Sequence, residues 1–188
     1  MRIISGSFKG KKISEPKDIK TRPLKDLTKE SIFNIIIHSK KFKMNLENSI
    51  ILDLFSGVGS FGIECLSRNV KKVIFVENYN GVLPLLKRNL ENLNLNEKFS
   101  VLENDIYEGN LFSKLENKFD IIFLDPPYKD YNIKKIFDEI QKRSILKKDG
   151  IIILHRHKKE KDIIPTNFKI VDVKQYGISK INFIKLLS

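Results

Sequence analysis

The chain has 188 residues, of which 41% are hydrophobic and 31% are charged, a composition that fits one globular domain with its own core. Its single cysteine excludes internal disulfides and cysteine-ligated zinc clusters, so we expect a reducing, cytoplasmic environment. No apolar run approaches the roughly 18 residues that a membrane span needs, which predicts a protein without membrane contact.

The net charge of +12 favours a polyanionic partner, and nucleic acid is the first such class. The excess charge is unevenly distributed along the chain. Residues 1–50 hold 12 basic and 5 acidic side chains, a net charge of +7, whereas residues 51–188 hold 23 and 18, a net charge of +5. The basic character is therefore densest before the first predicted core strand.

Residues 1–45 depart from the pattern of the rest, and we expect them to form an appendage packed on the main sheet. Residues 2–13 alternate apolar and basic side chains, which predicts a small basic β-hairpin. Thr21-Arg22-Pro23 predicts a turn, and the apolar spacing that follows predicts a helix over about Leu24–His38. The expected contacts to nucleic-acid phosphates are Arg2, Lys9, Lys11, Lys12 and Arg22.

Residues 46–188 alternate short β-branched runs with helical periodicity, the pattern of an α/β domain whose mostly parallel sheet is covered by helices. Helices are expected around residues 61–66, 83–93 and 133–140. A short turn at Tyr176–Ser179 separates the last two strands, which favours an antiparallel hairpin closing the sheet. The strands are expected at Ile50–Phe55, Val73–Glu77, Phe99–Leu102, Asp120–Asp125, Ile151–Leu154, Phe168–Gln175 and Lys180–Leu187.

A glycine-rich stretch, Asp53-Leu54-Phe55-Ser56-Gly57-Val58-Gly59-Ser60-Phe61-Gly62, lies between the first predicted strand and the helix after it, which is the setting of nucleotide-binding loops. Asp53 narrows the class of ligand, because a carboxylate beside the turn repels the pyrophosphate of a dinucleotide and attracts an ammonium group. S-adenosylmethionine has an ammonium group and no phosphate. We therefore expect this cofactor and disfavour a nicotinamide dehydrogenase.

Carboxylates also follow the next two predicted strands. Glu77 ends the second strand, at a spacing from Asp53 where a carboxylate can accept hydrogen bonds from both ribose hydroxyls. Asp105 follows the third strand and can accept from the exocyclic amine of an adenine, while Ile106 can pack on its ring. Because the carboxyl ends of parallel strands meet at one edge, these residues predict one crevice. The expected cofactor-binding residues are Asp53, Phe55, Gly57, Gly59, Glu77, Asn78, Asp105, Ile106 and Asp125.

The motif Asp125-Pro126-Pro127-Tyr128 ends the fourth predicted strand, beside that crevice. The prolines have no backbone N–H, so their carbonyls are left as acceptors. If the Asp125 carboxylate and the Pro126 carbonyl accept the two protons of a planar exocyclic amine, the nitrogen lone pair is directed at an electrophilic methyl group. Tyr128 would stack on a base that has left its helix or loop. We expect Asp125, Pro126, Pro127 and Tyr128 to be the catalytic residues, with no metal.

The histidines predict no further site. Lys148–Gly150 predicts a turn before the fifth strand, and His155 and His157 follow that strand in a basic run that is typical of a solvated loop. A metal site would need a third ligand at a suitable spacing, which this run does not offer.

The combination of Asp53-x-Phe55-x-Gly57-x-Gly59 with Asp125-Pro126-Pro127-Tyr128 resembles the class I S-adenosylmethionine-dependent amino-methyltransferases. The opening residues 2–13, Thr21-Arg22-Pro23 and Tyr176-Gly177 are similar to the RsmD family of bacterial 16S rRNA (guanine-N2)-methyltransferases. The resemblance runs nearly end to end. It implies a Rossmann-like domain with a seven-stranded sheet, an N-terminal basic hairpin, and action on one guanine of small-subunit rRNA in an assembled particle.

The chain departs from the family pattern after the Thr21-Arg22-Pro23 turn. The family usually has Asp-Arg-Val-Arg-Glu where this chain has Asp26-Leu27-Thr28-Lys29-Glu30. Leu27 and Lys29 thus replace arginines, and neither can reproduce the planar fork that an arginine offers to a phosphate or a base.

The resemblance predicts a monomer that transfers a methyl group to the N2 amine of a guanine in 16S rRNA, within the small ribosomal subunit or its assembly intermediate. Related proline-proline-aromatic motifs also act on adenine N6 in DNA and on protein glutamine, so both alternatives stay open. The small appendage disfavours DNA, because it leaves little room for a sequence-reading domain. A non-catalytic RNA-binding assembly factor is a third alternative, disfavoured by the intact acidic and proline residues.

Overall fold

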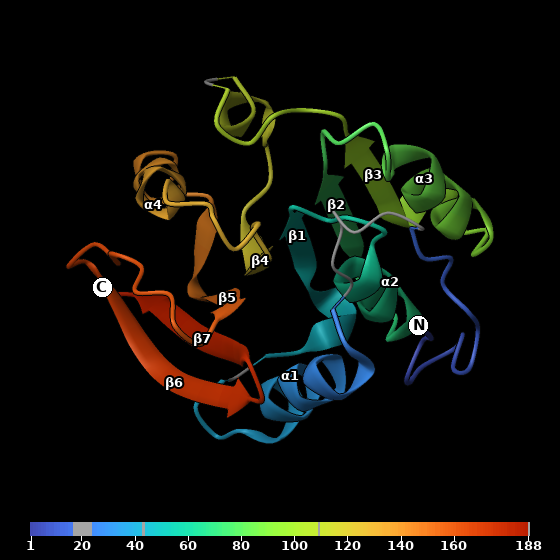
Figure 1. Ribbon diagram of the computed structural model, residues 1–188, viewed down its shortest axis with the longest axis horizontal. Coiled ribbons are helices and arrows are strands. Elements are labelled where there is room, and N and C mark those ends of the chain that lie inside the picture. The colour runs from blue at the N-terminus through green and yellow to red at the C-terminus, as the bar shows by residue number, and fades with distance from the viewer. Residues whose placement is uncertain (17–23, 43, 109, 188) are drawn as a thin grey trace.

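The computed structural model describes residues 1–16, 24–42, 44–108 and 110–187 (Figure 1). The α-helices are α1 (Asp26–His38), α2 (Ser60–Ser67), α3 (Leu83–Glu91) and α4 (Ile133–Lys142), and the 3₁₀ turns are η1 (Leu46–Asn48), η2 (Asn96–Lys98) and η3 (Phe112–Lys114). The strands are β1 (Ile50–Leu54), β2 (Lys72–Val76), β3 (Phe99–Leu102), β4 (Phe119–Leu124), β5 (Leu146–His157), β6 (Phe168–Tyr176) and β7 (Ser179–Leu186).

The seven strands form one sheet in the order β3-β2-β1-β4-β5-β7-β6, with β3 at one edge and β6 at the other (Figure 1). Strands β1 to β5 are parallel to their neighbours, while β7 pairs antiparallel with both β5 and β6. The predicted α/β fold is therefore confirmed, including the mostly parallel seven-stranded sheet and its antiparallel C-terminal hairpin. The order in which successive strands are added to the sheet reverses between β1 and β4, which places a crevice at the carboxyl edge of these parallel strands.

Alternate residues of each strand face opposite sides of the sheet, so the domain has two cores. Ile51, Phe75 and Phe123 share one core with α1, α2 and α3. Leu52 and Leu124 share the other core with α4 and η3. Because residues on both faces are apolar, the strands read as nearly continuous hydrophobic runs, as expected for a parallel sheet.

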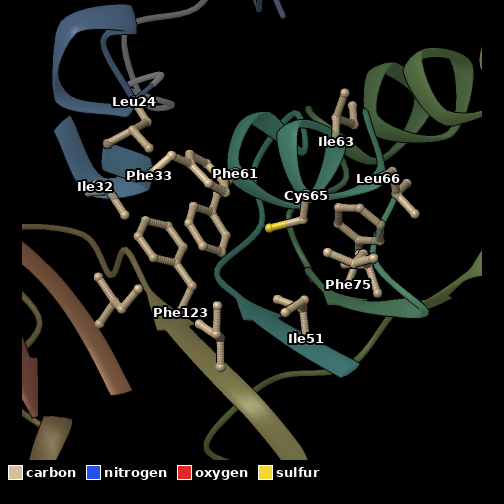
Figure 2. Packing of buried hydrophobic residues seen from close by; sticks show 14 of the residues in the cluster. Leu24, Ile32, Phe33, Ile51, Phe61, Ile63, Cys65, Leu66, Phe75 and Phe123 are labelled. Carbon is tan, nitrogen blue, oxygen red and sulfur yellow. The ribbon is translucent and has the colours of Figure 1, made fainter. Parts of the chain in front are cut away.

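Aromatic stacking joins α1 and α2 to the sheet. Phe61 of α2 lies between Phe33 of α1 and Phe123 of β4, with ring centroids 5.2 Å and 4.0 Å apart, and Figure 2 shows the three rings side by side. Figure 2 also shows the Cys65 sulfur pointing into this core, where burial raises the pKa of its thiol. The predicted N-terminal helix is thus packed directly onto the sheet domain.

The N-terminal segment packs along α2 and does not form two paired strands. One antiparallel bridge joins Arg2 to Lys12 among the described residues, so the predicted β-hairpin is present only as a loop closed by that bridge. The buried Glu64 carboxylate of α2 accepts hydrogen bonds from the amides of Ile4 and Ser5, at 2.8 and 3.0 Å. These backbone amides point toward α2, which leaves them unavailable for a strand ladder.

Two predictions about β5 were wrong. Lys148–Gly150 lies within β5 instead of forming a turn, with an irregular register where β5 pairs with β4. His155 and His157 also belong to β5, and His155 is buried. The reason is that the loop after β4 bonds to the polar side chains at the carboxyl end of β5: His155 contacts Asp125, and Arg156 donates to the Pro127 and Asp130 carbonyls.

Candidate active site

One large cavity, of about 910 Å³, opens at the carboxyl edge of the parallel strands. Its size is within the range of ligand-binding sites for small organic molecules. The predicted site residues that line it are Asp53, Phe55, Gly57, Glu77, Asn78, Asp105, Ile106, Asp125, Pro126, Pro127 and Tyr128. Gly59 lies just behind this lining, at the start of α2. The strand ends therefore bring the predicted residues together around one space.

The glycine loop after β1 needs glycine for two steric reasons. Gly59 has a φ of 86°, in the left-handed region, and a Cβ there would lie 2.7 Å from Leu86 Cδ1. A Cβ at Gly62 would lie 2.3 Å from a ring carbon of Phe75. The glycines thus let the start of α2 pack close against α3 and β2.

Asp53 is a buried carboxylate at the bottom of the cavity. Its Oδ2 accepts a hydrogen bond from the Gly62 amide at 3.0 Å, and it forms no salt bridge with any described residue. Burial raises the pKa of Asp53 well above its ordinary value, and the nearby charges of Asp125 and Glu77 raise it further. A cationic group entering the cavity beside Asp53 would relieve this cost.

Glu77 is held in position by backbone amides. One carboxylate oxygen accepts from Gly57 at 2.7 Å, and the other accepts from Asn78 and Tyr79 at 3.0 and 2.9 Å. These bonds link the end of β2 to the glycine loop. The oxygen that accepts from Gly57 keeps capacity for a further donor, so the carboxylate is oriented yet able to bind a ligand hydroxyl.

The residues after β3 complete this wall of the cavity. Asp105 Oδ2 accepts from the Asn78 side-chain amide at 2.9 Å, and its Oδ1 accepts from the Tyr107 amide at 2.7 Å. Ile106 is buried and lines the cavity. The Asp105–Asn78 bond couples the ends of β2 and β3, so the two polar side chains lie in reach of one ligand.

Another wall is the loop from Asp125 to Asp130, which is called the catalytic loop below after the role that the sequence predicts for it. The buried Arg156 of β5 donates from its two terminal nitrogens to the carbonyls of Pro127, at 2.9 Å, and Asp130, at 2.7 Å. Arg156 Nε is in turn held by the Asp162 carboxylate at 3.0 Å. The planar guanidinium therefore joins both ends of the Pro127–Asp130 turn to the sheet.

Tyr107 supports the same loop from the β3 side. Its hydroxyl donates to Asp130 Oδ2 at 2.6 Å, and burial together with this bond raises the pKa of Tyr107. Asp130 Oδ1 accepts from the Asn132 amide at 2.8 Å. The carboxylate of Asp130 is thus used within the fold, while the catalytic loop is fixed from two sides.

Two acceptors of the catalytic loop remain for a substrate. Asp125 Oδ1 is 2.8 Å from Nδ1 of His155, whereas among the described residues Oδ2 of Asp125 and the Pro126 carbonyl receive no hydrogen bond. Pro127 cannot serve in this way, because its carbonyl already accepts from Arg156 and from the Asp130 amide. The pair of free acceptors is the pair that the motif predicts for an exocyclic amine.

The predicted phosphate contacts do not lie together: Arg2 lies near the Ser60 end of α2, because Lys29 bonds to both the Arg2 carbonyl and Ser60 Oγ, whereas Lys9 lies near the other end of this helix. Ser7 and Phe8 donate to Ser67, at the far end of α2, while the cavity lies at the Ser60 end of this helix. The eight residues of α2 separate the two regions by about 12 Å. Arg2, Lys9, Lys11 and Lys12 are exposed and do not line the cavity, and Arg22 lies outside the described residues. Lys11 also contacts the Asn92 carbonyl.

The two positions that depart from the family pattern have opposite environments. Leu27 is exposed, whereas Lys29 is fully buried and donates to the Arg2 carbonyl at 2.8 Å. Burial lowers the pKa of Lys29, with the nearby carboxylates of Glu64 and Asp26 opposing that change. Lys29 therefore joins the N-terminal segment to α1 and α2 and does not face an external phosphate.

Comparison with known proteins supports the family resemblance along nearly the whole chain. The profile of the family described as "Conserved hypothetical protein 95", the RsmD family, matches residues 1–185. The chain belongs to this family. YlbH of Bacillus subtilis is 35% identical over 98% of both chains, and "Ribosomal RNA small subunit methyltransferase D" of Haemophilus influenzae is 31% identical over 95% of this chain and 90% of its own.

A solved structure of similar length has the same fold. A Haemophilus influenzae methylase structure, 30% identical, superposes with a TM-score of 0.76 over 100% of this chain and 98% of its own. Within the described part of the chain, no cluster of three or more metal-ligating side chains occurs, and no helix is long and apolar enough to cross a membrane.

Several residues of the site were missed by the sequence analysis. His155 and Arg156 directly follow a predicted strand, so the strand-end reasoning applied to Glu77 and Asp105 would have placed them at the same edge. Tyr107 follows Asp105 by two residues and was within reach of the same reasoning. The residues that line the cavity without having been predicted also include Leu24, Lys25, Ser56, Val58, Tyr79, Val82 and Ser179.

Proposed function

We propose that this RsmD family member transfers a methyl group from S-adenosylmethionine to the N2 amine of a guanine in 16S rRNA, within the small ribosomal subunit or its precursor. The observation that carries the proposal is the arrangement of two walls around one cavity. One wall offers carboxylates to an ammonium group and a ribose, and the other offers two free acceptors to an amine.

The residues on the glycine-loop side fit S-adenosylmethionine, which supplies an electrophilic methyl group on a sulfonium centre. Asp53 would bind the ammonium group, because it is buried beside the cavity without a cationic partner among the described residues. Glu77 would accept from the ribose hydroxyls, and Asp105 from the adenine amine, with Ile106 packed on the adenine ring.

The catalytic loop would bind and orient the guanine amine. Asp125 Oδ2 and the Pro126 carbonyl would each accept one N–H, which directs the nitrogen lone pair toward the methyl carbon. Formation of the N–C bond would break the methyl–sulfur bond, so S-adenosylhomocysteine leaves, and the amine would lose one proton to Asp125 or to solvent. Tyr128 lies at the cavity wall, with its ring 5.2 Å from that of His157, and would stack on the guanine. Alignment of the reacting atoms in the cavity then supplies most of the rate enhancement.

The exposed lysines of the N-terminal loop would hold RNA phosphates at a distance from the modified base. Such contacts fix the register of the RNA without reading its sequence. Their distance from the cavity suits a large folded RNA, which contacts the protein surface well beyond the one base that enters the cavity.

The test is to incubate the protein with methyl-tritiated S-adenosylmethionine and small ribosomal subunits from a strain lacking this activity. The rRNA is then digested and the labelled nucleoside is identified. We expect the label in N2-methylguanosine. Label in another nucleoside would overturn the assignment of the amine, and absence of label from the rRNA of subunits and their precursors would overturn the assignment of the substrate.

A further inference from the structure

His155 occupies a rigid position next to the catalytic loop. It lies in β5 between β4 and β7, opposite Ile181 of β7, and is 7% exposed. Its Nδ1 is 2.8 Å from Asp125 Oδ1. Because β7 pairs with β5 at His155, the sheet holds the backbone of this residue, and the imidazole provides a reference point for the carboxylate.

The surroundings of the ring assign its tautomer. Nε2 of His155 is buried and has no hydrogen-bond partner among the described residues. A proton on Nε2 would leave a buried N–H unsatisfied, whereas a proton on Nδ1 is shared with Asp125. The favoured form is therefore a neutral imidazole that donates from Nδ1 to Asp125 Oδ1.

We propose that His155 is a positioning residue for methyl transfer, a role that rests on the proposed function. By engaging Oδ1, the imidazole fixes the rotation of the Asp125 carboxylate and leaves Oδ2 as the oxygen that faces the substrate amine. His155 lines the cavity and acts through Asp125, which is its side-chain hydrogen-bond partner among the described residues. Arg156, the next residue, fixes the backbone of the catalytic loop in the same way.

The pairing can be measured without any enzymatic activity. The chain has three histidines, His38, His155 and His157, so their imidazole ¹⁵N resonances can be assigned with single variants. We expect His155 to carry its proton on Nδ1 in the intact protein, and Asp125→Ala to abolish this preference. His38, which is exposed at the end of α1, is the internal control. A proton on Nε2 of His155 in the intact protein would overturn the proposed pairing.

Kinetics test the positioning role. His155→Ala should lower kcat for rRNA methylation by about 10- to 100-fold, the scale expected when a reacting group is displaced by about 1 Å, with the KM for both substrates changed less than about threefold. His155→Asn places an amide N–H near the position of Nδ1 and should restore kcat to within about threefold. Thermal unfolding of each variant shows whether it remains folded.

Two kinetic results would overturn the role: an unchanged kcat in His155→Ala, or a folded His155→Asn variant as slow as His155→Ala. The second result would mean that a donor at Nδ1 is not what matters. If the intact protein methylates no rRNA, the proposed function fails, and the ¹⁵N measurement still decides whether His155 donates to Asp125.

Discussion

The two walls of the cavity are built in different ways. The part of the glycine-loop wall around Asp53 is local, because Asp53 bonds to Gly62 within the same strand–turn–helix unit. The catalytic loop is held by residues far away in sequence: His155 is 30 residues from Asp125, and Arg156 is 29 residues from Pro127. A local wall can keep its geometry when one distant residue changes, whereas the catalytic loop depends on β5. Substitutions in one wall should therefore impair the function of that wall, either cofactor binding or methyl transfer, and leave the other function largely unchanged.

The largest expected effect is on the chemical step. Asp125→Ala removes one of the two acceptors for the amine, and we expect kcat to fall by about 1,000-fold or more, within the range attributed to positioned acceptors and electrostatic stabilisation. Initial rates of methyl transfer to small subunits measure it. Asp138→Ala, on the exposed face of α4, is the matched control. A kcat within tenfold of the intact protein would refute the role of Asp125.

The next largest effect is on the glycine-loop wall. Asp53→Asn removes the charge proposed to bind the ammonium group, and affinity for S-adenosylmethionine should fall by roughly 10- to 100-fold, corresponding to the loss of a hydrogen bond between charged groups. Asp149→Asn, an exposed position on β5, is the control.

The same substitution should stabilise the unliganded protein. A carboxyl whose pKa is raised on folding costs stability as pH rises from the ordinary value of that pKa to its folded value, and the cost remains above it. Asp53→Asn should thus raise Tm at neutral pH by ~2–4 °C, about 1 kcal/mol, with a smaller gain at acidic pH. A lower Tm at neutral pH would contradict this account of Asp53.

The pH dependence of binding follows from the same pKa. As pH falls through the raised pKa of Asp53, the carboxylate takes up a proton and can no longer pair with an ammonium group. Affinity for S-adenosylmethionine should fall in that range, and Asp53→Asn should remove the dependence. Calorimetric titration at several pH values measures both. An equal pH dependence in the variant would place the responsible group elsewhere.

A smaller effect is expected at the backbone of the catalytic loop. Arg156→Lys keeps the charge but loses the fork that bonds to the Pro127 and Asp130 carbonyls, and we expect kcat to fall by about tenfold with cofactor affinity unchanged. Arg143→Lys at the end of α4 makes the same change on the surface. Equal losses of kcat and cofactor affinity would show that the two walls are not independent.

The smallest effect is expected outside both walls. Lys9→Ala with Lys12→Ala removes two exposed charges of the N-terminal loop and should reduce RNA affinity severalfold, with the slope of log affinity against log salt lowered by about one unit for each lost phosphate contact. Lys114→Ala with Lys118→Ala is the control pair. An unchanged slope would place the RNA surface elsewhere on the molecule.

The same contrast explains what could be predicted from sequence. The fold and the placing of Asp53, Glu77 and Asp105 at one edge followed from apolar periodicity and from the parallel arrangement of strands. The supports of the catalytic loop did not follow, because a basic run after a strand has the same composition whether it is solvated or enclosed. Only the contacts with the loop after β4, which is about 30 residues away in sequence, make His155 and Arg156 internal.

The N-terminal segment shows a second limit of the same kind. Alternation of apolar and basic residues suggested paired strands, but the backbone amides of Ile4 and Ser5 bond instead to Glu64 of α2. The direction in which these amides point is determined by Glu64, which is 60 residues from Ile4 in sequence. A local sequence pattern does not contain this information.

The most direct test of the central claim is a calorimetric titration with S-adenosylmethionine of the intact protein, Asp53→Asn and Asp125→Ala under identical conditions. Separate walls predict that Asp125→Ala binds within about threefold of the intact protein, while Asp53→Asn binds at least about tenfold more weakly. Equal loss of affinity in the two variants, or normal affinity in Asp53→Asn, would contradict the assignment of the cofactor to the glycine-loop wall.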